Sequence, residues 1–121
     1  MRVRLIAVGT RLPAWATSAC AEYLKRLAPQ LAVSVTEIAP GPRTAGGAAA
    51  KAIATEGQRL LAALRADDHV AALDERGREF STRELAAWLK QRMHAGSDLT
   101  FVIGGADGLA AAVRERADTT L

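Results

Sequence analysis

Four short apolar runs, separated by longer segments of helical pattern, constrain the fold of this chain more than any other feature. The runs lie at Val3–Val8, Val33–Ile38, Val70–Leu73 and Leu99–Ile103. Apolar runs of this length, bounded by turn residues, are typical of strands. Regular alternation with helices predicts an α/β fold, with a mainly parallel sheet and helices on both faces. We expect residues 1–121 to form one domain.

The segments between these runs carry helix signals. Ser81 and Glu84 have the spacing of a capping box, and Asp107 is expected to cap the last helix. Pro40–Gly47 is a loop by composition. The predicted helices cover Pro13–Leu27, Ala48–Ala66, Ser81–Gly96 and Gly108–Ala117.

Two strand ends are the candidate ligand site, because parallel α/β sheets bind ligands at the carboxyl ends of their strands. These ends are Leu73–Asp74 and the glycine-rich run Gly104–Gly108. Glycine lets the backbone approach a ligand closely, although a tight turn alone accounts for these glycines equally well. A glycine-rich turn between a strand and a helix is compatible with two classes of ligand. One class contains phosphate groups, and the other consists of neutral or zwitterionic cofactors.

The details of the glycine-rich run disfavour a phosphate. Its glycine spacing does not match the dinucleotide-binding fingerprint, and no Lys followed by Ser or Thr gives a P-loop. Asp107 would stand where an anion binds and would repel it. A neutral or zwitterionic cofactor therefore fits better, and a nucleotide-binding Rossmann-like domain is the weaker alternative.

The remaining polar residues suggest no catalytic group. His69 and His94 are the only histidines, and neither has a cysteine or carboxylate at metal-ligand spacing, so no metal site is predicted. Asp67–Asp68 is expected to be a solvated turn rather than a catalytic pair. The catalytic residues stay unassigned.

Charge is distributed unevenly along the chain. Residues 1–60 hold eight Lys/Arg and three Asp/Glu, whereas residues 61–121 hold eight and ten, so that +5 and −2 give the net charge of +3. A basic N-terminal half suits a polyanionic partner, and a solvated arginine-rich surface is the alternative. No apolar stretch approaches the roughly 18 residues that a membrane span requires. We expect a cytoplasmic protein without a membrane partner.

Several short motifs follow one another in a fixed order. They are Arg4–Thr10, Glu22–Leu27, Glu37–Ile38, Glu56–Leu61, Leu73–Arg78 and Phe101–Leu109. Together they resemble the RlmH family of SPOUT methyltransferases, and the resemblance runs from Met1 to Leu121. Phe101–Leu109 is the most specific of these motifs.

The resemblance implies a SPOUT α/β-knot fold, a homodimer and S-adenosyl-L-methionine as methyl donor. The implied reaction is methylation of N3 of a pseudouridine in 23S ribosomal RNA, on the assembled ribosome. By motif match, Leu73 and Gly104 are cofactor contacts, with Gly105 beside them. With RNA as the partner, the basic residues expected to dock the ribosome are Arg11, Lys25, Arg26 and Arg43.

Family members continue past the position that matches Leu121, with a segment that supplies a second cofactor loop, a strand and a last helix. We therefore expect the C-terminal knot segment to be missing from residues 1–121, and a chain that stops there to be inactive. The alternative is a non-catalytic ribosome- or RNA-binding remnant of the same fold.

Overall fold

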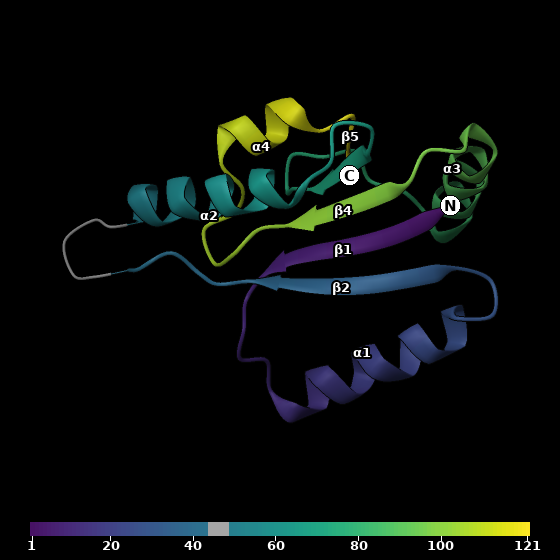
Figure 1. The fold of residues 1–121 in the computed structure, drawn as a ribbon, viewed down its shortest axis with the longest axis horizontal. Coiled ribbons are helices and arrows are strands. Elements are labelled where there is room, and N and C mark those ends of the chain that lie inside the picture. Colours follow the sequence, from purple (N-terminus) through teal and green to yellow (C-terminus); the bar gives the residue numbers. More distant parts are fainter. Residues whose placement is uncertain (44–48) are drawn as a thin grey trace.

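A computed structural model describes residues 1–43 and 49–121 of the chain. Within these residues, all five strands pair in parallel in one sheet, in the order β2-β1-β4-β3-β5 (Figure 1). The predicted α/β fold with a parallel sheet is confirmed. The elements in chain order are β1 (Arg2–Val8), α1 (Ala14–Leu27), β2 (Ala32–Ile38), α2 (Ala49–Ala63), β3 (His69–Leu73), α3 (Thr82–Ala95), β4 (Leu99–Ile103), α4 (Ala111–Arg116) and β5 (Thr119–Thr120).

Helices cover both faces of the sheet, as predicted. On one face, the core consists of side chains from β1, β3 and β4 together with Leu60 of α2 and Val113 of α4. On the other face, Val3, Ala71 and Leu99 pack with Trp88 of α3. Figure 1 shows α2 and α4 on the same side of the sheet, while α1 lies along the β2 edge. Every residue of α1 keeps some solvent exposure.

Helix α3 forms because both of its ends carry the local chemistry that a helix needs. The Ser81 hydroxyl accepts a hydrogen bond from the Glu84 N–H at 3.1 Å, which is one half of the predicted capping box. The Glu84 carboxylate lies 3.9 Å from Arg78. Gly96 ends the helix with a positive φ of 85°, a conformation that glycine adopts without strain.

Two predicted helix boundaries are wrong. Helix α2 ends at Ala63 instead of Ala66, because the Asp68 carboxylate accepts from the Arg65 N–H at 3.0 Å and stabilises a turn there. The last helix begins at Ala111 rather than Gly108, and its N-cap residue, Ala110, makes no side-chain capping hydrogen bond. The predicted start of α2 at Ala48 and part of the Pro40–Gly47 loop lie outside the described residues.

Strand β5 is absent from the prediction because two residues cannot display an alternating pattern. It is attached to β3 by long-range contacts. The Asp118 N–H donates to the Val70 carbonyl at 2.8 Å, and the Val70 N–H donates to the Asp118 carboxylate at 2.8 Å. His69 lies 2.9 Å from the Thr119 hydroxyl and 2.8 Å from the Arg92 guanidinium. The His69 side chain therefore connects the start of β3 to β5 and to α3.

No helix in the part of the chain that the structure describes is both long enough and apolar enough to cross a membrane.

Candidate functional site

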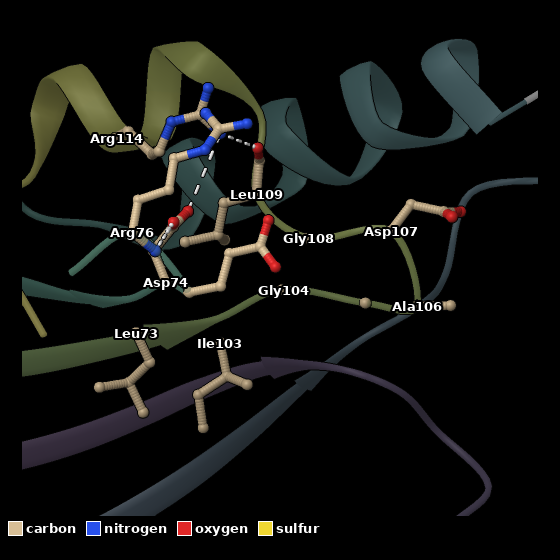
Figure 2. A pocket seen from close by; sticks show the side chains of 12 residues that line it. Leu73, Asp74, Arg76, Ile103, Gly104, Ala106, Asp107, Gly108, Leu109 and Arg114 are labelled. Atoms are coloured by element: carbon tan, nitrogen blue, oxygen red, sulfur yellow. Dashed lines mark hydrogen bonds and ion pairs between the residues drawn. The ribbon is translucent and has the colours of Figure 1, made fainter.

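The candidate site lies where β3 and β4 end next to each other. Leu73 and Ile103 are paired in the sheet, so the turns that follow these strands leave from the same edge. Between the turns is a cavity of about 410 Å³ (Figure 2). Its walls are formed by Leu73, Asp74, Glu75, Arg76, Ile103, Gly104, Gly105, Ala106, Asp107, Gly108, Leu109 and Arg114.

The structure brings the three predicted site residues together in this cavity. Leu73, at the end of β3, and Gly104 and Gly105, directly after β4, all line it. Leu73 is 38% exposed, a high value for a leucine at the end of an inner strand. Figure 2 shows the Leu73 and Ile103 side chains on the side of the sheet away from α4. An apolar surface is therefore open to a ligand at this edge.

The loop requires glycine at positions 104 and 108, for a different structural reason at each. The Gly108 N–H donates to the Gly105 carbonyl at 3.1 Å, so the loop folds back on itself. Gly108 has a positive φ of 86°, which favours glycine. A Cβ atom at Gly104 would lie 2.7 Å from the carbonyl group of Gly108. Position 104 therefore accepts glycine alone without a shift of the loop.

Charged groups of both signs surround the cavity. The Asp74 carboxylate accepts from the Arg76 N–H at 2.8 Å and lies 3.9 Å from the Arg114 guanidinium. Arg114, on α4, also donates to the Leu109 carbonyl at 2.5 Å (Figure 2). The carboxylate of Glu75 completes a mixed lining. Such a lining suits a ligand that itself carries both charges.

Sequence reasoning misses Arg114 as a site residue. It lies on the short helix after the loop, 40 residues from Asp74 along the chain. No local spacing signals that these two side chains meet. The fold brings them together, because α4 returns over the carboxyl end of β3 on its way to β5.

Asp107 has a different role from the one predicted. It does not cap a helix, because α4 begins four residues later, at Ala111. Its carboxylate instead accepts a hydrogen bond from Arg43 Nε at 2.9 Å. The expectation that Asp107 repels an anion at a helix start is therefore wrong, because Asp107 does not lie at the start of a helix. Asp107 still lines the cavity as an exposed acidic group.

Arg43 is held by a buried carboxylate as well as by Asp107. Glu56, on α2, lies 2.7 Å from Arg43 Nη1. Burial alone would raise the pKa of Glu56, but the hydrogen bonds from Arg43 and from the Gly41 N–H outweigh it and hold the pKa below its usual value. The guanidinium of Arg43 is thus already occupied by two carboxylates.

Within residues 1–43 and 49–121, the structure contains no group of three or more His, Cys, Asp or Glu side chains arranged to hold a metal ion.

Comparison with known proteins places the chain in a family. A family model described as "Predicted SPOUT methyltransferase" matches residues 1–121. Proteins named Ribosomal RNA large subunit methyltransferase H are similar along the whole chain. The protein from Thioalkalivibrio sulfidiphilus is 47% identical over 118 residues, which cover 98% of this chain and 76% of the relative.

Two further relatives with the same name agree. The protein from Chromobacterium violaceum is 41% identical and that from Burkholderia mallei 43% identical, each over 121 residues, or 100% of this chain and 78% of the relative. The chain thus spans about three quarters of the length of these relatives. Together with the parallel sheet and the family-model match over every residue, these similarities show that the chain belongs to the SPOUT methyltransferase family.

Proposed function

We propose that the protein is a cytoplasmic methyltransferase that uses S-adenosyl-L-methionine to methylate N3 of a pseudouridine in 23S ribosomal RNA, on the assembled ribosome. One observation carries the proposal. A cavity at the ends of β3 and β4 is present in a chain that is 41% and 47% identical to two relatives named as large-subunit ribosomal RNA methyltransferases.

The residues around the cavity fit this cofactor. A volume of about 410 Å³ lies within the usual range of small-molecule sites, roughly 300–1,000 Å³. Leu73 offers an apolar surface, and the backbone of Gly104 and Gly105 permits close approach. Asp74 and Glu75 supply negative charge suited to a zwitterion with a cationic sulfonium. When bound, S-adenosylmethionine supplies an activated methyl group.

A direct measurement of methyl transfer tests this function. The full-length natural protein is incubated with ribosomes that lack the modification and with labelled S-adenosylmethionine. We expect the label on one pseudouridine of 23S RNA, identified as the N3-methyl product by mass spectrometry. Transfer to another nucleotide would overturn the proposed target, and ribosome binding without transfer would establish a non-catalytic binding protein instead.

The RNA partner is supported by exposed basic side chains. Arg11, Lys25 and Arg26 are exposed, whereas Arg43 is bound to Glu56 and Asp107. Arg26 also makes an exposed pair with Glu22, a contact of little energetic weight. The three exposed residues are therefore the better candidates for contacts with ribosomal phosphates.

Replacing Arg11, Lys25 and Arg26 together by Ala is expected to weaken ribosome binding and make it less sensitive to salt. Removing one phosphate-binding side chain lowers the slope of log affinity against log salt by about one. The dissociation constant is measured at several salt concentrations, with Arg83→Ala on α3 as the matched exposed control. An unchanged slope in the triple variant would exclude these residues from the interface.

We also infer a homodimer, as the family resemblance implies. Large apolar side chains on and next to α1 support a protein contact there, because Leu12, Trp15 and Tyr23 are 51%, 75% and 63% exposed.

A further inference from the structure

A buried carboxylate lies directly beneath the glycine-rich loop of the candidate site. The side chain of Glu56 is 2% exposed. Its carboxylate accepts from the Gly41 N–H at 2.9 Å and from both terminal nitrogens of Arg43, at 2.7 and 3.3 Å. A Cβ atom at Gly105 would come within 3.0 Å of Glu56 Oε1. The loop backbone therefore rests against this carboxylate.

Arg43 extends this contact to the far side of the loop. While its terminal nitrogens face Glu56, its Nε donates to the Asp107 carboxylate at 2.9 Å. One guanidinium thus joins the α2 helix, the segment after β2 and the loop after β4. Asp107 lines the cavity, but Arg43 and Glu56 do not. We name these three residues the loop bridge.

A gain in net stability does not account for the loop bridge. Burying a carboxylate is costly, and a buried ion pair is often no better for stability than apolar packing. The planar guanidinium nevertheless offers fixed directions that apolar groups lack, so it can hold two carboxylates in one geometry. What the loop bridge adds over apolar packing is therefore position rather than net stability.

Among the described contacts, few others hold the loop in place. Within Gly104–Gly108, the backbone hydrogen bond is the one from the Gly108 N–H to the Gly105 carbonyl. That bond shapes the turn but does not attach it to the rest of the molecule. The Arg43–Asp107 contact does attach it, across 64 residues of sequence.

We propose that Arg43 and Glu56 are positioning residues of the cofactor site, which act through Asp107 to hold the Gly104–Gly108 loop at the distance from β3 that the ligand requires. The proposal rests on the proposed function for the identity of the ligand. It extends that function to two residues outside the cavity. Neither residue needs to touch the cofactor.

The test combines cofactor affinity with hydrogen exchange of the loop. For Arg43→Met, we expect the dissociation constant for S-adenosylmethionine, measured by calorimetry, to rise by about 10- to 100-fold, since losing a hydrogen bond to a charged group costs roughly that factor. Exchange of the amides at residues 104–108 should accelerate without cofactor, while amides of β1 and β4 stay protected. Wild-type affinity and wild-type exchange in this variant would overturn the proposal.

Conservative variants separate positioning from general stability. Asp107→Asn keeps the size of the side chain but weakens the contact to Arg43, whereas Asp107→Glu keeps the charge. We expect the Asn variant to show faster loop exchange and weaker binding, and the Glu variant to stay within about threefold of wild type. Because the Asp107 side chain is exposed, both variants should fold even if Arg43→Met does not. Equal behaviour of the Asn and Glu variants would contradict the role of the charge.

An exposed arginine outside the loop bridge provides the matched control. Arg83→Met makes the same substitution on α3 and should leave both readouts unchanged. Failure of the wild-type protein to bind S-adenosylmethionine would reject the proposed function. The exchange measurement needs no cofactor, so it would still decide whether the loop bridge positions the loop.

Discussion

Gly104→Val is expected to abolish binding of S-adenosylmethionine and, with it, methyl transfer. The reason is a steric clash with the backbone of the loop. A Cβ atom at position 104 would lie 2.7 Å from the carbonyl carbon and oxygen of Gly108 and 3.0 Å from the Leu109 nitrogen. These are backbone atoms, so the loop itself must move. Overpacking that forces the backbone to shift costs about 1–3 kcal/mol and occasionally more, so we expect the affinity to fall by roughly 100-fold or more by calorimetry.

A second valine variant controls for the added side chain. Ala112→Val places the same side chain at an exposed position of α4 and should bind within about threefold of wild type. Thermal unfolding of both variants establishes that they fold. If Gly104→Val folds and binds the cofactor as tightly as wild type, then the ligand site does not lie at this loop.

The longer elements are predictable from the sequence because each carries its own local pattern. The four predicted strands match β1 to β4 within one residue at each end. Helix α3 is equally predictable, since Ser81 and Gly96 supply its start and its end locally. The cavity of the candidate site lies where the same reasoning expects it, because the ends of parallel strands share one edge of a sheet.

The contacts that complete the site are not predictable, because their partners are far apart in sequence. Arg43 and Asp107 are separated by 64 residues, and each has a plausible local role that the structure does not show. Asp107 fits a helix cap by its position, and Arg43 fits a surface cation by its charge. Tertiary contacts determine the roles of both residues instead, and such contacts leave no periodic pattern in the sequence.

Asp67 and Asp68 show the same limit within one pair of neighbours. Both fit a solvated turn by composition. In the structure, Asp67 is exposed, but the Asp68 side chain is only 1% exposed and lies 2.5 Å from Arg4 Nη2 on β1. The expectation of a solvated turn is thus wrong for Asp68. Asp68 is buried because α2 packs against β1. This packing places the carboxyl end of α2 next to Arg4, near the start of β1.

Asp68→Ala is expected to be among the most destabilising single substitutions in the protein. The Asp68 carboxylate also accepts from the Arg65 N–H at 3.0 Å and from the Thr100 hydroxyl at 3.2 Å. Its loss leaves Arg4 largely buried without its counter-charge, and breaking such a pair typically costs about 3–5 kcal/mol. A domain's free energy of unfolding is about 5–15 kcal/mol. Urea unfolding at pH 7 measures the difference from wild type.

Two companion variants test the cause. Asp67→Ala, at the exposed neighbour, should change the free energy of unfolding by no more than about 0.5 kcal/mol. The double variant Arg4→Met with Asp68→Leu removes both charges and should recover much of the loss, since apolar packing can replace a buried ion pair. A loss in the double variant as large as that in Asp68→Ala would show that the unpaired charge of Arg4 is not the source of the destabilisation.

The same carboxylate makes the stability of the protein depend on pH in a defined direction. Burial alone would raise the pKa of Asp68, but the hydrogen bonds from the Arg65 N–H and the Arg4 guanidinium outweigh it, so the pKa lies below the usual value of 3.8. The unfolded chain therefore binds the proton more readily than the folded protein. The stabilisation is complete well above pH 3.8 and is lost as the pH falls through the lower, folded-state pKa. The difference in stability between wild type and Asp68→Ala should accordingly be constant from pH 6 to pH 8 and shrink in acid, and a difference that grows in acid would refute the assigned charge state.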